Sequence, residues 1–247
     1  MSSAGEIRIL TTPQELFAAA GEEVVRLANE SVNSQGRFTI ALSGGSTPKS
    51  LFNLLATNAK SSLPWDRAFF FWSDERHVAP TDPDSNYRMA DEAMLSKVPV
   101  PPANVFRIEA ENPDAAAAAA AYEQTIRKFF QTRDGVPKFD LILLGMGPDG
   151  HTASLFPGTA GLGEKSRLVI ANWVEKLQTH RLSFTLPLIN AAKCVAFLVS
   201  GMDKAPALKA VLESNASGEQ YPSKLVHPKD GKLIWFLDRA AASGLTS

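Results

Sequence analysis

The sequence has little cysteine, little net charge and no long hydrophobic run. Its one cysteine, Cys194, excludes an internal disulfide and any zinc cluster built from several thiolates. The 25 lysines and arginines stand against 26 aspartates and glutamates, and the resulting net charge of −1 argues against a general nucleic-acid binder. No apolar run approaches the roughly 20 residues that span a bilayer, so we expect no membrane protein.

The amino-terminal segment and the use of cysteine both favour the cytoplasm. Residues 1–8 lack the charged-then-apolar layout of a secretory signal, and the early Glu6 disfavours a transit peptide. A single cysteine also fits a reducing compartment. We therefore expect a cytosolic protein.

Apolar strands alternate with amphipathic helices along all 247 residues, without a repeat or a Gly/Ser-rich linker. Thr12, Pro13 and Glu15 are typical of a helix start, and Gly36 ends that helix. The pattern predicts strands at 37–42, 68–72, 139–144, 168–171, 194–199 and 233–237, and further helices at 47–55, 85–94, 112–129 and 203–212. We therefore predict one α/β domain over 1–247, with a mainly parallel central sheet and helices on both faces.

The first polar segment at a strand end is Ser-Gly-Gly-Ser-Thr-Pro at 43–48. Ligands of open parallel sheets bind beyond the carboxyl ends of the strands. Gly44 and Gly45 let backbone N–H groups approach a ligand, and the following helix points its positive end there. Ser46 and Thr47 add hydroxyl donors, although the segment is neither a Walker sequence nor a dinucleotide fingerprint. It is either a phosphate cradle or a tight turn with a capping threonine.

The second polar segment, Ser-Asp-Glu-Arg-His at 73–77, follows the aromatic strand. Arg76 at this edge is suited to fixing a phosphate or polarising a carbonyl, because its guanidinium offers a bidentate fork. Asp74 is a candidate to orient Arg76 or to hydrogen-bond a sugar hydroxyl. The alternative for the whole segment is a solvated strand end.

The third polar segment, at 145–158, contains a glycine-rich loop that ends at His151. Histidine suits a general base at physiological pH. Asp149 is a candidate to hold the imidazole in the needed tautomer, or alternatively to brace the loop. Ser154 lacks the Gly-x-Ser-x-Gly context of a serine hydrolase, and no histidines have H-E-x-x-H spacing, so we expect neither a covalent serine nor a metal.

Together these segments resemble the signature segments of the 6-phosphogluconolactonase family. The matching segments are Ser43–Pro48, Trp72–Arg76 and Gly145–Gly158, and the likeness runs from the first helix to Trp235. The resemblance implies a Rossmann-like α/β fold and hydrolysis of 6-phospho-D-glucono-1,5-lactone to 6-phosphogluconate in the oxidative pentose phosphate pathway, without a cofactor. Related sugar-phosphate isomerases and deaminases share the first segment, so they are an alternative, as is a catalytically silent sugar-phosphate sensor.

A δ-lactone is an activated ester, so its hydrolysis needs water and a base. We predict that His151 takes a proton from water and then protonates the departing ring oxygen, while Arg76 or loop amides stabilise the oxyanion. Arg167, Arg181 and Lys204 are candidates for binding the phosphate, and the alternative for each is an exposed surface charge. No exposed heptad pattern is present, so we expect a monomer whose partner is the small lactone, with no nucleic acid or membrane.

Overall fold

The computed structural model describes residues 5–58 and 62–246 of the chain. Residues 1–4, part of the segment on which the prediction of compartment rests, lie outside them. A parallel sheet with the order β1-β9-β8-β5-β2-β3 forms the centre of the molecule. Its strands are β1 (Glu6–Leu10), β2 (Phe38–Leu42), β3 (Ala68–Trp72), β5 (Leu141–Gly145), β8 (Cys194–Val199) and β9 (Lys232–Asp238).

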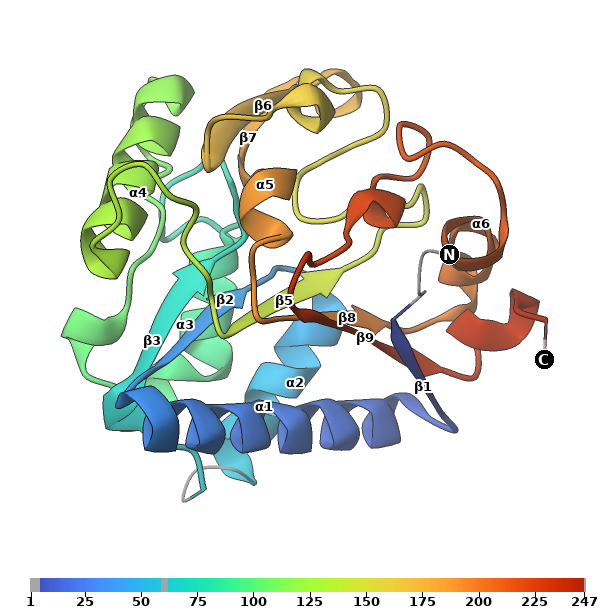
Figure 1. Ribbon diagram of the computed structural model, residues 1–247, viewed down its shortest axis with the longest axis horizontal. Helices are drawn as coiled ribbons and strands as arrows, with labels where there is room; N and C mark the ends of the chain where they lie inside the picture. Colours follow the sequence, from blue (N-terminus) through green and yellow to red (C-terminus); the bar gives the residue numbers. More distant parts are fainter. Residues whose placement is uncertain (1–4, 59–61, 247) are drawn as a thin grey trace.

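Helices cover both faces of the central sheet, as Figure 1 shows. Below it in that view lie α1 (Pro13–Gln35) and α2 (Ser46–Thr57), and α3 (Asn86–Ala93) packs against α2. Above it lie α4 (Ala115–Phe130) and α5 (Leu186–Ile189), and α6 (Ala205–Glu213) follows β8. The predicted α/β class with a parallel central sheet is confirmed. None of the helices in the described part of the chain is long and apolar enough to cross a membrane.

The helix boundaries follow from local capping chemistry. The backbone N–H of Glu15 donates to Thr12 Oγ1 at 3.2 Å, and Gly36 ends α1 in the left-handed region at φ 77°. The sequence predicts these residues at the two ends of the helix, and this prediction is confirmed. Helix α2 begins at Ser46, one residue earlier than expected, and its N-cap is Gly45 at φ 105° with no side-chain cap. The alternative of a capping threonine in this turn is therefore wrong.

A second, smaller antiparallel sheet was not predicted. It has the order β4-β7-β6 and consists of β4 (Asp74–Arg76), β7 (Thr179–Phe184) and β6 (Val169–Val174). The expected strand at 168–171 belongs to this sheet, and the segment at 73–77 forms a strand within it, so the alternative of a solvated strand end at 73–77 is wrong. Strand β4 continues the chain from β3 after one residue, which joins the small sheet to the carboxyl edge of the large one.

The interior is rich in aromatic side chains. The rings of Phe197 and Trp235 stack at 3.9 Å with an interplanar angle of 4°, and Phe71 meets Phe139 edge to face at 5.1 Å. Cys194 lies in the same interior, and its burial raises the pKa of the thiol to about 12. The thiol is therefore a small buried hydrophobic group rather than a nucleophile, as its apolar strand predicts.

Candidate active site

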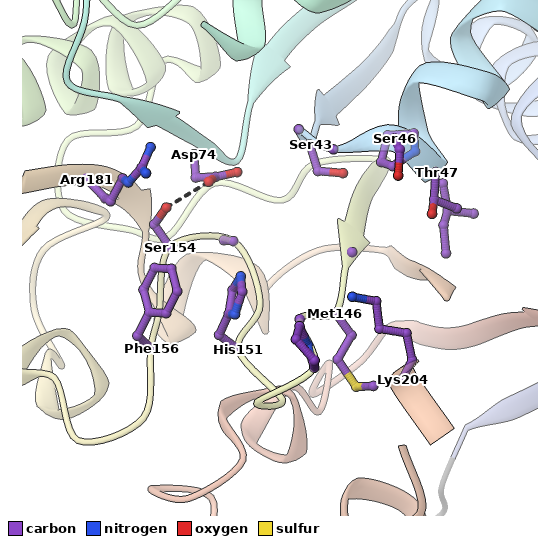
Figure 2. Close-up of a pocket in the computed structure, with 18 of the residues that line it drawn as sticks. Ser43, Ser46, Thr47, Asp74, Met146, His151, Ser154, Phe156, Arg181 and Lys204 are labelled. Carbon is purple, nitrogen blue, oxygen red and sulfur yellow. Dashed lines mark hydrogen bonds between the residues drawn. The ribbon is translucent and has the colours of Figure 1, made fainter. Parts of the chain in front are cut away.

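A cavity of about 250 Å³ opens at the carboxyl ends of β2, β5 and β8, where all three predicted polar segments meet (Figure 2). Parallel strands end at one edge of a sheet, so segments far apart in sequence converge there. Most of the residues proposed from the sequence line this cavity: Gly44, Gly45, Ser46, Thr47, Asp74, Arg76, His151, Arg181 and Lys204. The exceptions are Asp149 and Arg167, which line a neighbouring cavity of about 710 Å³.

The first loop owes its shape to close packing against α3. A Cβ atom on Gly44 would lie 1.9 Å from Asn86 Oδ1, so only glycine fits at this position. Asn86 in turn donates from Nδ2 to the backbone oxygen of Asp74 at 2.9 Å, which ties α3 to β4. The loop then leads directly into α2, whose amino-terminal N–H groups and partial positive charge face the cavity and suit an anion.

His151 is held against the carboxylate of Asp149. Its Nδ1 lies 2.5 Å from Asp149 Oδ1, and its backbone N–H donates to the same oxygen at 3.2 Å. Asp149 thus contacts both the imidazole and the backbone of the loop, which is compatible with either of the two roles proposed for it. Gly147 leaves room for the ring, because a Cβ atom there would lie 2.1 Å from two imidazole atoms. Phe156 stacks on the ring at 4.1 Å.

The ionisation of Asp149 fixes the tautomer of His151. Burial opposes the charged form, but hydrogen bonds from His151 and Lys176 outweigh it and hold the pKa of Asp149 well below its ordinary value. An ionised carboxylate can only accept hydrogen bonds, so Nδ1 of His151 carries the hydrogen. Nε2 is consequently the ring nitrogen that can accept a proton.

Two arginines are cross-strand neighbours in the small sheet, since Arg76 of β4 and Arg181 of β7 are paired in register. Arg76 donates from Nη1 to the backbone oxygen of Asp84 at 2.8 Å. The buried Nε of Arg181 has no hydrogen-bond partner among the described residues. Burial, together with the charge of Arg76, lowers the pKa of Arg181. A cation with an unused donor at the cavity wall is arranged to meet an anion.

Asp74 and Ser154 form a buried pair next to these arginines. Ser154 Oγ donates to Asp74 Oδ2 at 2.8 Å (Figure 2). The hydroxyl of Ser154 is therefore committed to a carboxylate and buried, which agrees with the expectation that it is no nucleophile. Asp74 makes no ion pair with Arg76 in the described part of the chain, so the structure does not support its predicted role of orienting Arg76.

The two remaining candidates for binding the phosphate, Lys204 and Arg167, lie in different places. Lys204 lines the cavity and pairs with Asp203 at 2.9 Å. The Arg167 side chain is 65% exposed and bonds to Glu164 at 2.6 Å, so the structure does not bring it to the cavity. The cavity also contains residues that the sequence did not single out, among them Phe156 and Ser200. Ser200 follows β8 directly, so the rule of strand ends would have found it.

The cavity combines a histidine, three cations and a helix amino terminus. Within residues 5–58 and 62–246, no group of three or more His, Cys, Asp or Glu side chains is arranged to hold a metal ion. The histidine, the cations and the helix amino terminus together suit the binding of a phosphorylated molecule next to a water molecule that loses a proton.

Comparisons of the sequence with known proteins all lead to one family. The sequence profile of the family described as "Glucosamine-6-phosphate isomerases/6-phosphogluconolactonase" matches residues 11–235. The chain is 42% identical over 241 residues to a 6-phosphogluconolactonase of Nostoc sp., which covers 97% of this chain and 98% of that protein. A 6-phosphogluconolactonase of Synechocystis sp. is 43% identical over 243 residues, which cover 98% of this chain and 99% of the relative.

Solved structures share the whole fold. The 6-phosphogluconolactonase from Trypanosoma cruzi superposes with a TM-score of 0.90 at 31% identity, over 100% of this chain and 99% of that one. The match to the profile extends over most of the chain, and the relatives align over nearly their full length. The chain therefore belongs to the glucosamine-6-phosphate isomerase/6-phosphogluconolactonase family.

Proposed function

We propose that His151 is the general base with which this chain hydrolyses 6-phospho-D-glucono-1,5-lactone to 6-phospho-D-gluconate, a step of the oxidative pentose phosphate pathway. Relatives of this activity align over nearly the whole chain. The observation that carries the mechanism is the contact between His151 Nδ1 and Asp149 at 2.5 Å. It leaves Nε2 as the acceptor at a cavity that also holds Arg76, Arg181 and Lys204.

The reaction uses one water molecule and one base. Nε2 of His151 removes a proton from water as the water oxygen attacks the lactone carbonyl carbon. The imidazolium, paired with Asp149, then gives that proton to the ring oxygen as the bond between it and the carbonyl carbon breaks. The product is an open-chain acid, which ionises at neutral pH. Acid–base help of this kind is worth about 10²–10⁴-fold in rate.

Binding of the substrate uses both ends of the cavity. In Figure 2, Lys204 lies below Ser46 and Thr47, and Arg181 and Asp74 lie at the opposite end. We assign the phosphate to the α2 terminus, with the amides of Gly44 and Gly45, Ser46, Thr47 and Lys204, because a helix amino terminus and an ammonium both favour an anion. Arg76 and Arg181 then stabilise the negative charge that develops on the carbonyl oxygen. Asp74 accepts a hydrogen bond from a sugar hydroxyl.

A direct assay separates this function from its alternative within the family. The purified chain is given the phosphorylated lactone, a glucosamine 6-phosphate and an aldose phosphate, and loss of lactone, release of ammonia and formation of ketose are followed. We expect rapid loss of lactone, and much weaker turnover of glucono-1,5-lactone, which lacks the phosphate. Ammonia or ketose formed without turnover of the lactone would contradict the proposal.

The assembly and location of the enzyme are part of the same proposal. The chain acts as a single-domain monomer in the cytosol, with the small lactone as its partner. One hydrophobic core that includes residues of both sheets supports the single domain. Light scattering on the eluting protein tests the monomer, and a mass twice that of the chain would contradict it.

A further inference from the structure

Lys176 is a charged residue close to the pair formed by Asp149 and His151. It has no role in the mechanism above. It lies in the short 3-10 turn η5 (Glu175–Leu177), at the tip of the hairpin formed by β6 and β7. Its Nζ forms an ion pair with Asp149 Oδ2 and lies 4.6 Å from the centre of the Phe156 ring. The side chain is 53% exposed, so it approaches Asp149 from the solvent side.

The two oxygens of Asp149 have different partners. Oδ1 accepts from Nδ1 and from the backbone N–H of His151, whereas Oδ2 accepts from Lys176. Phe156 contacts both outer groups, since the imidazole stacks on its ring and the ammonium lies over the same ring. Lysine, aspartate and histidine thus form a chain of three groups from the hairpin to the cavity.

Asp149 alone would stabilise the imidazolium and so hold the proton on His151. A cation on the second carboxylate oxygen competes for the same negative charge and also repels an imidazolium. Neutral histidine is the form that can act as a base. The charged side chains around His151 come from several elements: the acids are Asp149 and Asp74, and the cations are Lys176, Arg76, Arg181 and Lys204.

We propose that Lys176 is a positioning residue for the reaction, which orients Asp149 and offsets part of the charge that this carboxylate presents to His151. The inference rests on the proposed role of His151. Lys176 touches neither the substrate nor the reacting atoms, because it does not line the cavity that holds His151. It acts through Asp149.

The test is the pH profile of kcat/KM for lactone hydrolysis in four variants. In Lys176→Met the acidic limb should move to higher pH by about half a unit to one unit, because the imidazolium loses a nearby opposing charge. In Asp149→Asn it should move to lower pH, because the imidazolium loses its carboxylate. Lys176→Arg should keep the limb near that of the unchanged enzyme. Lys165→Met removes an exposed charge whose side chain has no ion pair in the described residues, and it should leave the limb in place.

If Lys176 had only a structural role, Lys176→Met would lower the thermal midpoint of unfolding or the plateau value of kcat/KM. The acidic limb of the pH profile would then stay where it is in the unchanged enzyme. A limb in Lys176→Met that coincides with that of the unchanged enzyme overturns the inference, as does an equal shift in Lys165→Met. Should Lys176→Met not fold, Lys176→Gln carries the same expectation. The proposed function fails by a different result, namely an unchanged enzyme that does not hydrolyse the lactone at all.

Discussion

Replacing Arg181 with methionine should lower activity and raise stability in one step. The residue carries a buried Nε–H without a partner in the described part of the chain and stands opposite a second cation, Arg76. In the free enzyme this guanidinium is half-buried and forms no ion pair in the described residues, although the carboxylates of Asp74, Asp84 and Glu75 offset part of the cost of its burial. In the complex its donors meet an anionic oxygen of the substrate.

The two effects can be estimated separately. A hydrogen bond to a charged group contributes about 1.5–3 kcal/mol, so loss of Arg181 should lower kcat/KM by roughly 10- to 150-fold. Replacing a buried charge by an apolar group of similar volume can stabilise a protein by about 1–4 kcal/mol, and since Arg181 is only half-buried we take about 1 kcal/mol. For a chain of this length that corresponds to a rise of roughly 2–4 °C in Tm.

The assay pairs steady-state kinetics on the phosphorylated lactone with thermal unfolding of the free enzyme. Arg167→Met is the matched control, because that side chain is exposed and bonded to Glu164 away from the cavity. Its kcat/KM should stay within about twofold of the unchanged enzyme, as for other exposed charges. A kcat/KM in Arg181→Met that stays near the original, or a Tm that falls by several degrees, would refute the reasoning.

Three further variants test other parts of the structure. Gly44→Ala should cost about 1–3 kcal/mol of stability, because its Cβ would lie 1.9 Å from Asn86 Oδ1. The matched control is Gly163→Ala, whose Cβ would have no atom of a residue other than its chain neighbours within 4 Å among the described residues. It should be nearly neutral in thermal unfolding. Asp140 accepts four hydrogen bonds in the interior, so Asp140→Ala should cost about 3–5 kcal/mol in denaturant unfolding while the folded fraction keeps its kcat/KM. The pKa of Asp149 is lowered in the folded state, so its ionisation stabilises the fold above about pH 4. This stabilisation is lost as the pH falls further. The difference in Tm between the unchanged enzyme and Asp149→Asn should therefore shrink below that pH.

The central sheet was predictable because its inner strands are apolar along nearly their whole length. Each of β2, β5 and β8 is an apolar run buried along nearly its whole length, and a strand buried on both faces leaves such a run in the sequence. Since parallel strands end at one edge, the polar segments after them could also be placed together. His151 and the glycine loop at 43–48 were found in this way, and both line the cavity.

The small sheet was not predictable, because its pairing is not local. Strand β7 has the mixed sequence Thr-His-Arg-Leu-Ser-Phe, and its partner β4 lies about a hundred residues earlier in the chain. For this reason Arg181 and Arg167 looked equivalent in the sequence, although only Arg181 faces the cavity. Lys176 gave no signal at all, because its position depends on the hairpin that brings it to Asp149.

The measurement that tests the central claim most directly compares His151→Ala with the unchanged enzyme on 6-phospho-D-glucono-1,5-lactone, after subtraction of spontaneous hydrolysis. The account predicts that kcat falls by about 10²–10⁴-fold. It also predicts that the affinity for 6-phosphogluconate, measured by calorimetry, stays within about threefold, because the cations that bind the anionic groups are intact. A folded His151→Ala enzyme that hydrolyses the lactone at the original rate would contradict the account.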